Sequence, residues 1–517
     1  MNIVLLTLNA TYQHTAFGLR YLQANLKEYQ NHSTILEYTL QKDPREIVEQ
    51  LKTLNPRILG LGVYIWNTQA MLTLVKLIRQ LMPETFVVLG GPEVSFETET
   101  QEICKYAHYT ICGEGEVEFY KLCHQILNLN EPPLKSILRG PLPEISELKL
   151  PYSLYSDEDL RHRYIYVEAS RGCPFKCEYC LSSLDTKVRA FDLDLFLNEI
   201  HLLLDRGARS FKFIDRTFNL NIQFCIKILN FFLSKIHLGL FLHFEMVPDR
   251  LPEELKSLIQ QFPKGSLQFE IGIQTWNPQV AQLISRKCDF EKAKENFYFL
   301  STQTQVHSHA DLIVGLPGET LDSFAQGFNQ LYRCQPDEIQ LGLLKRLKGT
   351  PIIRHDHEWA MLYQVAPPFT ILQTKTMSFE EIQKMTRFSR YWDLFANSGN
   401  FKNYISALLK DSESPFLTFW NFSEYLSRRH SQSFAISLLN LTESAWNYMT
   451  QELHWNKEFA RPPLLLDYSI ERKRDVPHFL REDSSNSSIS SKKEAFKKNE
   501  NHTKTSNATP RRQQKHQ

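Results

Sequence analysis

The first 150 residues alternate between short apolar runs and segments whose apolar residues recur at helical spacing. Residues 3–8 and 57–66 are apolar runs of strand length, and between them Leu19, Leu22 and Leu26 recur every three or four positions. Runs of this length predict buried strands, whereas a three-to-four-residue repeat predicts a helix with one buried face. Because the two patterns alternate several times, we expect a doubly wound, Rossmann-like parallel sheet.

The residues that follow the predicted strands are candidate ligand contacts, because ligands of doubly wound sheets bind at the carboxyl ends of the strands. No G-x-G-x-x-G motif follows the first strand, so a dinucleotide is not supported. Glycine pairs also serve as ordinary turn residues, since glycine adopts positive φ, and this alternative stays open. The candidates are small or polar residues at three strand ends, namely Asn9 and Thr11, Gly90 and Gly91, and Gly113 and Glu114.

A second strand–helix alternation follows a proline-rich linker and fills residues 151–362. It contains about six strand–helix units, and right-handed crossovers would arrange these as an open, partial (β/α)6 barrel. Polar residues gather after its predicted strands, at the end where barrel-type enzymes hold their active sites. The sequence therefore predicts an α/β protein with two consecutive parallel sheets.

Helical patterns dominate residues 363–480. The capping box at 378–381 begins an amphipathic helix, and 402–409 and 431–453 predict further helices, so we expect a mainly helical C-terminal domain. The Ser/Asn/Lys-rich residues 481–517 have little to bury and predict a disordered basic tail.

Composition narrows the class of protein. The 517 residues are 42% hydrophobic and 23% charged, which is typical of a globular chain with two or three domains. The formal net charge of +1 argues against a general nucleic-acid-binding surface. No apolar run reaches the roughly 18 residues of a membrane span, and the N-terminus does not resemble a signal peptide. Nine scattered cysteines do not resemble a secreted disulfide framework, so we expect a reducing cytoplasm.

Three of these cysteines, Cys173, Cys177 and Cys180, lie within eight residues of each other. They follow an extended, aromatic and β-branched run over 164–172, so we expect a strand that leads into a Gly/Pro loop. Four-iron clusters normally take four protein thiolates, and three would leave one iron open to a substrate or cofactor. A zinc site or a merely structural loop is the alternative, but zinc sites usually add a second Cys/His pair, and none stands out here.

The C-x3-C-x2-C spacing, with Tyr179 directly before its last cysteine, is identified as the signature of radical S-adenosylmethionine (SAM) enzymes. The resemblance implies that the three cysteines hold a [4Fe–4S] cluster whose fourth iron binds SAM. One-electron reduction would then cleave SAM to a 5′-deoxyadenosyl radical, so a reductant such as flavodoxin or ferredoxin is an implied partner. Phe175 and Tyr179 would shield the cluster and tune its potential.

Three further strand exits resemble SAM-contacting motifs of this superfamily. Asp215 stands where the superfamily often has G-G-E and would accept hydrogen bonds from the SAM ammonium. Glu270 and Gln274 fall in an E-x-G-x-Q motif, and Gly315 falls in a glycine motif beside the adenine. Arg286 would pair with the SAM carboxylate. In the alternative interpretation Asp215 and Glu270 cap helices, and Arg286 forms a surface salt bridge.

Two pairs of polar residues alternate along predicted strands, so the members of each pair share a face. The pairs are His243 with Glu245 and His307 with His309. They would line a substrate cavity or form internally paired polar groups, and no catalytic base is assigned among them.

Residues 9–22 resemble the opening of the cobalamin-binding domain that precedes many radical SAM domains. The resemblance implies that the strand-end candidates of the first domain contact cobalamin. Domains that ligate cobalt through a histidine carry D-x-H-x-x-G, whereas this chain has Tyr12-Gln-His14-Thr-Ala-Phe17, without the aspartate and with the glycine one place late. We therefore expect cobalamin to bind without a protein histidine, and axial ligation by His14 is the alternative.

These resemblances predict a cobalamin-dependent radical SAM enzyme that methylates an unactivated carbon, with radical rearrangement or oxidation as an alternative outcome. A tRNA methylthiotransferase would need three more cluster cysteines in the first domain and a C-terminal β-barrel. The cysteines in the first domain of this chain are wrongly placed for a cluster, and its C-terminal part is predicted to be helical. A non-catalytic cobalamin carrier or sensor with a structural cluster is the third hypothesis. Residues 391–399 resemble an extra domain of unknown role, whose aromatic residues form a core or a lid. No motif fixes the substrate.

Overall fold

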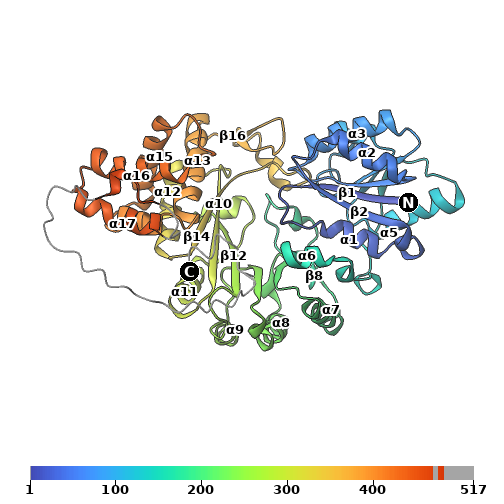
Figure 1. The fold of residues 1–517 in the computed structure, drawn as a ribbon, viewed down its shortest axis with the longest axis horizontal. Coiled ribbons are helices and arrows are strands. Elements are labelled where there is room, and N and C mark those ends of the chain that lie inside the picture. The colour runs from blue at the N-terminus through green and yellow to red at the C-terminus, as the bar shows by residue number, and fades with distance from the viewer. Residues whose placement is uncertain (1, 470–474, 482–517) are drawn as a thin grey trace.

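A computed structural model describes residues 2–469 and 475–481 (Figure 1). The N-terminal unit contains a six-stranded sheet in the order β2-β1-β3-β4-β5-β6, and every neighbouring pair is parallel. The strand order reverses at β1, which lies between β2 and β3, so the predicted doubly wound sheet is confirmed. The strands are β1 (Ile3–Asn9), β2 (Ser33–Thr39), β3 (Ile58–Gly62), β4 (Phe86–Gly90), β5 (Tyr109–Cys112) and β6 (Ile137–Arg139).

Helices cover both faces of this sheet. Successive residues of a strand point to opposite faces, so Val4 packs with α2 and α3, whereas Leu5 packs with α1 and α5. The second face requires Gly60, because a Cβ there would lie 2.7 Å from Leu5 and 3.0 Å from the ring of Phe119. The helices are α1 (Phe17–Ala24), α2 (Pro44–Leu54), α3 (Thr68–Leu81), α4 (Glu102–Tyr106) and α5 (Glu116–His124).

The central unit is a partial barrel. Six parallel strands pair in the order β14-β13-β12-β11-β10-β7, and β7 and β14 form its two edges. The strands are β7 (Ile165–Val167), β10 (Ser210–Phe213), β11 (Phe241–Met246), β12 (Leu267–Gln274), β13 (His307–Val314) and β14 (Glu338–Leu343). This arrangement confirms the predicted partial (β/α)6 barrel.

Burial alternates strictly along β12, where Phe269 and Ile271 are buried while Glu270 and Gly272 are half-buried. The buried side chains belong to the hydrophobic core beneath the outer helices, so the half-buried ones face the barrel lumen. A short helix, α6 (Asp157–His162), leads into β7. The outer helices are α7 (Leu193–Asp205), α8 (Ile222–Ser234), α9 (Glu253–Ile259), α10 (Pro278–Leu283), α11 (Phe290–Gln303) and α12 (Leu321–Arg333).

The C-terminal unit is mainly helical, as predicted. Ser378 forms a capping box with Glu381 at the start of α13. The helix predicted over 431–453 begins instead at Leu438, because the side chain of Ser437 accepts a hydrogen bond from the Asn440 N–H and caps it there. The helices are α13 (Phe379–Trp392), α14 (Lys402–Leu409), α15 (Pro415–Arg429), α16 (Leu438–Asn447) and α17 (Lys457–Ser469).

Two features complete this unit. A small antiparallel pair that the sequence pattern did not predict, β15 (Leu362–Tyr363) with β16 (Ile371–Gln373), precedes α13. Residues 482–517, which carry nearly all of the predicted tail, lie outside the described residues. Among the described helices, none has the length and apolar character needed to cross a membrane.

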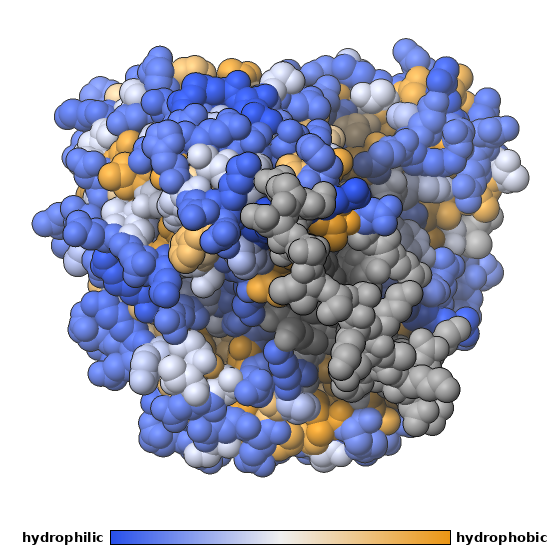
Figure 2. All heavy atoms as spheres, turned by 60° about the vertical axis from the view of Figure 1, so that its left-hand side comes forward, coloured by the Kyte–Doolittle hydropathy of each residue, from blue (hydrophilic) through white to orange (hydrophobic). Residues whose placement is uncertain are grey.

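The aromatic residues of this unit form a core rather than an exposed lid. Phe388 and Trp392 on α13 are 0% and 3% exposed and pack on Phe328 of α12, with ring centroids 5.6 and 4.9 Å away. Phe416 and Phe419 of α15 add rings 4.9 and 5.1 Å from Phe388. The helical end of the molecule is mainly hydrophilic outside, with scattered hydrophobic residues (Figure 2).

Replacing Phe388 by alanine should therefore destabilise the C-terminal unit by about 3–5 kcal/mol, because it empties the centre of this aromatic cluster. Phe379 on the same helix is 45% exposed and provides the matched control. Thermal unfolding of the two variants measures the effect. Equal unfolding temperatures for Phe388→Ala and Phe379→Ala would contradict the core assignment.

Candidate active site

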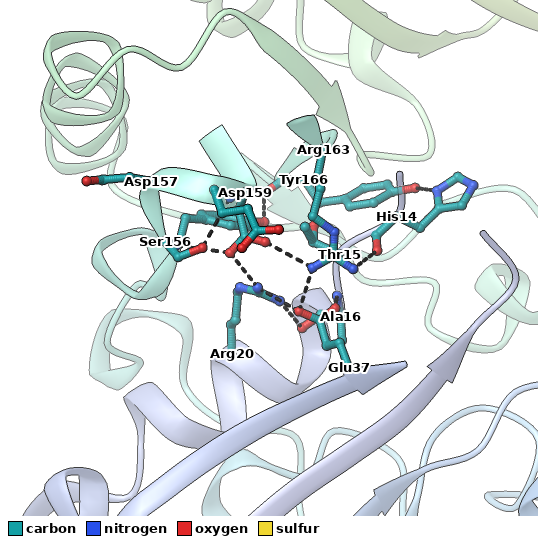
Figure 3. Close-up of polar contacts among 12 residues, drawn as sticks. His14, Thr15, Ala16, Arg20, Glu37, Ser156, Asp157, Asp159, Arg163 and Tyr166 are labelled. Atoms are coloured by element: carbon teal, nitrogen blue, oxygen red, sulfur yellow. Dashed lines mark hydrogen bonds and ion pairs between the residues drawn. The ribbon is translucent and has the colours of Figure 1, made fainter. Parts of the chain in front are cut away.

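A buried cluster of four charged side chains joins the N-terminal sheet to the entry of the barrel (Figure 3). Arg20 on α1 lies 2.8 Å from Glu37 on β2 and 2.9 Å from Asp159 on α6. Arg163 lies 3.0 Å from Glu37 and 2.9 Å from Asp159. Although burial favours the neutral acids, the guanidinium of Arg20 holds the pKa of both carboxyl groups below their ordinary values. Both carboxyl groups are therefore ionised at neutral pH.

The loop between β1 and α1, which carries His14, is held from the barrel side of this interface. The Arg163 guanidinium donates hydrogen bonds to the carbonyl oxygens of Tyr12, at 2.8 Å, and His14, at 2.7 Å. The His14 Nδ1 lies 2.6 Å from the hydroxyl oxygen of Tyr166 on β7. The barrel thus fixes both the backbone and the ring of the histidine loop.

A cavity of about 1070 Å³ lies between the carboxyl ends of β1, β3, β4 and β5 and the first strands of the barrel. This volume is at the upper end of the roughly 300–1,000 Å³ of small-molecule sites, so the cavity suits a large ligand. Seven glycines line its wall, and at Gly113 a Cβ would meet nothing within 4 Å; the seven are Gly18, Gly60, Gly62, Gly90, Gly91, Gly113 and Gly115. Gly91 also serves the turn, because at φ +109° a Cβ would lie 2.4 Å from the Val63 carbonyl oxygen.

Most of the predicted cobalamin contacts line this cavity, but Thr11 is exposed and does not. Asn9 supports the histidine loop, since its side chain donates to the His14 carbonyl oxygen at 2.9 Å and to Glu37 at 3.1 Å. His14 also borders the cavity, and burial followed by the charge of Lys212 lowers its pKa. Cobalamin binding without a protein histidine stays a prediction, with axial ligation by His14 as the alternative. The predicted contacts that line the cavity are Asn9, Gly90, Gly91, Gly113 and Glu114.

Glu114 has a second role that the sequence did not indicate. Arg171, at the start of the cysteine loop, lies 2.8 Å from both Glu114 and Glu116 and 2.9 Å from Glu168. Arg189, at the end of the same loop, also binds Glu114. These ion pairs connect the cysteine loop directly to the rim of the large cavity. The sequence did not indicate this connection, because neither Arg171 nor Arg189 belongs to a recognisable motif.

A smaller cavity of about 170 Å³ collects most of the predicted cluster and SAM residues. Burial, and more weakly Cys180 and Cys177, raise the pKa of the Cys173 thiol, which places the three sulfur atoms within electrostatic reach of each other. Within the described residues, however, no three His, Cys, Asp or Glu side chains form a ready-made metal site. The donor chemistry fits an iron–sulfur cluster, and the ligand roles stay predictions. The predicted residues that line this cavity are Cys173, Phe175, Cys177, Tyr179, Cys180, Glu270, Gln274 and Arg286.

Arg286 closes one side of this cavity, and its guanidinium is already engaged. Its Nε donates to the Ile273 carbonyl oxygen at 3.0 Å, its Nη2 donates to the Gly272 carbonyl oxygen, and its Nη1 lies 3.7 Å from the Cys177 Sγ. These contacts hold the β-bulge in which Gln274 adopts φ +72°. Its partners are two backbone carbonyls, the Cys177 thiol and the Tyr179 hydroxyl at 3.3 Å. None of them is the carboxylate that a surface salt bridge would need. Pairing with the SAM carboxylate stays a prediction.

Asp215 and Gly315 do not line the smaller cavity. The Asp215 carboxylate accepts hydrogen bonds from the Ala169 N–H at 2.9 Å and the Ser170 hydroxyl at 2.6 Å, and burial raises its pKa to about 7. It therefore fixes the segment that leads into the cysteine loop. Gly315 has φ +85°, and a Cβ there would lie 2.7 Å from Ile371, so it also permits close packing.

The cysteine loop is anchored by Glu178, which the sequence analysis missed. This carboxylate is 3% exposed and accepts hydrogen bonds from Ser285 at 2.5 Å and from Arg354, and it lies 2.9 Å from the His355 Nε2. Its partners come from the residues just after α10 and from the segment after β14, 107 and 177 positions away, so no local pattern could have indicated them.

The lumen between the two cavities contains imidazole–carboxylate pairs. The His243 Nε2 lies 3.1 Å from Glu270, and the His309 Nε2 lies 3.3 Å from Asp311. Burial lowers the pKa of His243, whereas Asp311 raises that of His309 against the effect of burial. The other predicted lumen residues are paired as well, Glu245 with Arg216 at 2.8 Å and His307 with Glu338 at 3.0 Å.

Comparison with known proteins gives three family matches. Residues 3–122 match the B12 binding domain, residues 167–331 match the radical SAM superfamily, and residues 357–517 match a protein family of unknown function, DUF4080. The chain therefore carries a radical SAM domain over residues 167–331, preceded by a B12-binding domain over residues 3–122.

Individual relatives agree with these matches. The uncharacterized methyltransferase PH0819 of Pyrococcus horikoshii is 23% identical over 409 residues, which cover 72% of this chain and 85% of that protein. The cobalamin-dependent radical SAM methyltransferase TokK of Streptomyces tokunonensis is 23% identical over 333 residues, 56% of this chain and 47% of that protein. The ribosomal protein uS12 methylthiotransferase RimO of Chlamydia pneumoniae is 24% identical over 51% of this chain and 56% of that protein.

A solved structure shares the fold over most of the chain. The cobalamin-dependent SAM radical enzyme OxsB, with aqua-cobalamin bound, has a TM-score of 0.60 and 13% identity over 90% of this chain and 84% of that chain. At this identity the likeness shows the arrangement of the two parallel sheets and the helical end.

Replacing Glu37 by glutamine should cost roughly 3–5 kcal/mol of stability at pH 7, because two buried guanidinium groups lose a shared partner. Glu46→Gln, which alters an exposed pair with Lys42, is the control. The folded-state pKa of Glu37 is depressed, so its stabilisation is present above the unfolded value of about 4.3 and disappears as the pH falls through the lower folded value. Unfolding temperatures of the variants and the wild type from pH 7 to pH 3 measure this difference. A difference that is as large at pH 3 as at pH 7 would contradict the assignment.

Proposed function

We propose that this chain is a cobalamin-dependent radical SAM methyltransferase that modifies a carbon atom of a substrate. The observation that carries the proposal is the arrangement of two sites in one chain. A cavity large enough for a corrinoid and a cavity lined by three cysteines border the same barrel lumen. The matches to B12-binding and radical SAM domains support both cofactors.

When bound, the cluster and SAM supply a one-electron cleavage that starts radical chemistry, and cobalamin supplies a transferable methyl group. Cys173, Cys177 and Cys180 would hold the cluster, with Phe175 and Tyr179 excluding water around it. The cavity of about 170 Å³ is below the usual size of a small-molecule site. SAM would therefore enter only if the side chains that line it rearrange.

The other predicted SAM residues fall into two groups: residues that line the smaller cavity and residues that hold neighbouring segments in place. Glu270 and Gln274 reach the smaller cavity and are proposed SAM contacts. Asp215 and Gly315 are proposed to act on SAM indirectly, by fixing the cysteine loop and the packing of β16. Arg286 places a positive charge beside the Cys177 sulfur, where it would stabilise thiolate ligation.

The alternatives are less well supported. A methylthiotransferase of the kind weighed above would carry a C-terminal β-barrel, whereas the described residues after 378 form helices. A carrier or sensor would bind cobalamin without cleaving SAM, and a rearrangement or oxidation enzyme would cleave SAM without consuming a methyl group. A reductant such as flavodoxin or ferredoxin is a proposed partner. All nine cysteines are unpaired, which supports a reducing compartment, and the cytoplasm is the proposed one.

Anaerobic reconstitution of the full chain with iron, sulfide, reductant, cobalamin and SAM should give a cluster absorbance band and release 5′-deoxyadenosine. Cys177→Ala should abolish both, because two thiolates cannot hold the cluster. Cys334→Ala, a half-buried cysteine on the outer side of the barrel, is the matched control and should retain both. Chromatography of the nucleoside and absorbance spectra measure the two quantities.

Two outcomes would contradict the proposal. The first is a wild-type protein that binds cobalamin tightly but never cleaves SAM, which would favour the carrier or sensor. The second is 5′-deoxyadenosine release that survives in Cys177→Ala.

A further inference from the structure

The lumen of the partial barrel is polar, although barrel interiors are usually filled by branched apolar side chains. Strand register brings Lys212 of β10 between Tyr166 of β7 and His243 of β11. His243 reaches Glu270 of β12 through an ion pair of 3.1 Å, and Glu270 stands beside His309 of β13. A continuous row of ionisable side chains thus crosses five consecutive strands.

This row spans the distance between the two cavities. Tyr166 lines the larger cavity, and Glu270 and Asp311 line the smaller one. If both cofactors act on one acceptor, as the proposed function requires, the acceptor must lie against this row. The inference therefore rests on the proposed function and concerns the chemistry of the acceptor.

Lys212 is the member of this row that acts on its neighbours only at longer range, through the electrostatic effect of its charge on His14, Glu245 and Glu270. Its neighbours are already paired: Tyr166 with His14 at 2.6 Å, Glu245 with Arg216 at 2.8 Å and Glu270 with His243 at 3.1 Å. Across the described part of the chain, the Lys212 ammonium makes neither a hydrogen bond nor an ion pair, although the side chain is half-buried. A half-buried ammonium without a partner is costly, and an anionic ligand would compensate it.

Two imidazoles of the row, His243 beside Lys212 and His309 farther along on β13, also have unused polar atoms. His243 is 4% exposed and its Nδ1 makes no hydrogen bond, and the buried His309 Nε2 also lacks one, since it meets Asp311 only as a 3.3 Å ion pair. Buried polar atoms are nearly always hydrogen-bonded, so such exceptions call for an explanation. A polar ligand in the lumen would satisfy them.

We propose that the lumen binds a methyl acceptor with an anionic oxygen group, a carboxylate or a phosphate, and that Lys212 pairs with that group. His243 and His309 contribute hydrogen bonds to the polar part of the same molecule. Lys212 is thus a specificity-determining residue, because a neutral analogue of the acceptor would leave its charge uncompensated.

The test measures binding of small probe molecules to the reconstituted full chain, loaded with cobalamin and SAM, by saturation-transfer NMR. The probes are matched sets, such as indole-3-acetic acid with indole-3-acetamide, and phenyl phosphate with phenol. At least one anionic class should bind roughly tenfold or more tightly than its neutral partners, as expected for a charge-assisted hydrogen bond. If the carboxylates bind more tightly than their neutral partners, the anionic group of the acceptor is a carboxylate. If the phosphates do so, it is a phosphate.

Variants of Lys212 test whether this residue causes the preference for anionic probes. Lys212→Met should remove it and Lys212→Arg should keep it, while iron and cobalamin contents verify that each variant is folded and loaded. Lys256→Met, which removes a lysine paired with Glu253 on α9, is the matched control and should keep the preference.

Three outcomes would overturn the proposal. They are the absence of any anion preference in the wild type, a preference that survives in Lys212→Met, and acid binding that occurs only without SAM. The last would assign Lys212 to the SAM carboxylate. Cys177→Ala, probed with cobalamin alone, separates this proposal from the radical chemistry, since it should lose SAM cleavage and keep the anion preference.

Discussion

Four buried charges determine how the two halves of the molecule face each other. Arg20 and Glu37 belong to the N-terminal sheet, Asp159 and Arg163 belong to the entry of the barrel, and each guanidinium meets both carboxylates. Removing charges from water is expensive, and only complete pairing compensates for it. Any other orientation of the two units would leave buried charges without partners. The cluster therefore directs the carboxyl ends of the N-terminal strands toward the barrel lumen, which is where the larger cavity lies.

The two proposed cofactor sites share the segments that hold them. Arg171 connects the cysteine loop to Glu114 at the rim of the larger cavity. The segment after β14 repeats this connection on the opposite side, because Lys348 binds Glu93 beside the Gly90–Gly91 turn, and His355 lies 2.9 Å from Glu178 within the cysteine loop. Between the two sites lies a lumen of ionisable side chains rather than a packed apolar core.

Local patterns were enough to predict much of this structure. Both parallel sheets follow from short-range hydrophobic periodicity, and the cysteine motif is contained in eight residues. The interactions that orient these parts depend on pairs far apart in the chain, such as Arg163 and Glu37, which are 126 positions apart. Motif position also failed to show where side chains point. Asp215 turns toward the backbone of the cysteine loop instead of the cavity, and Thr11 points to solvent although its neighbours line the larger cavity.

The central claim is that one chain holds cobalamin and an iron–sulfur cluster on two sides of one barrel lumen. Anomalous difference maps at the cobalt and iron edges, from an anaerobic crystal of the reconstituted full chain, test it directly. The account predicts a cobalt peak in the cavity bordered by Gly91 and Tyr166, and an iron peak beside Cys173, Cys177 and Cys180. A cobalt peak outside that cavity, or iron bound away from these cysteines, would contradict it.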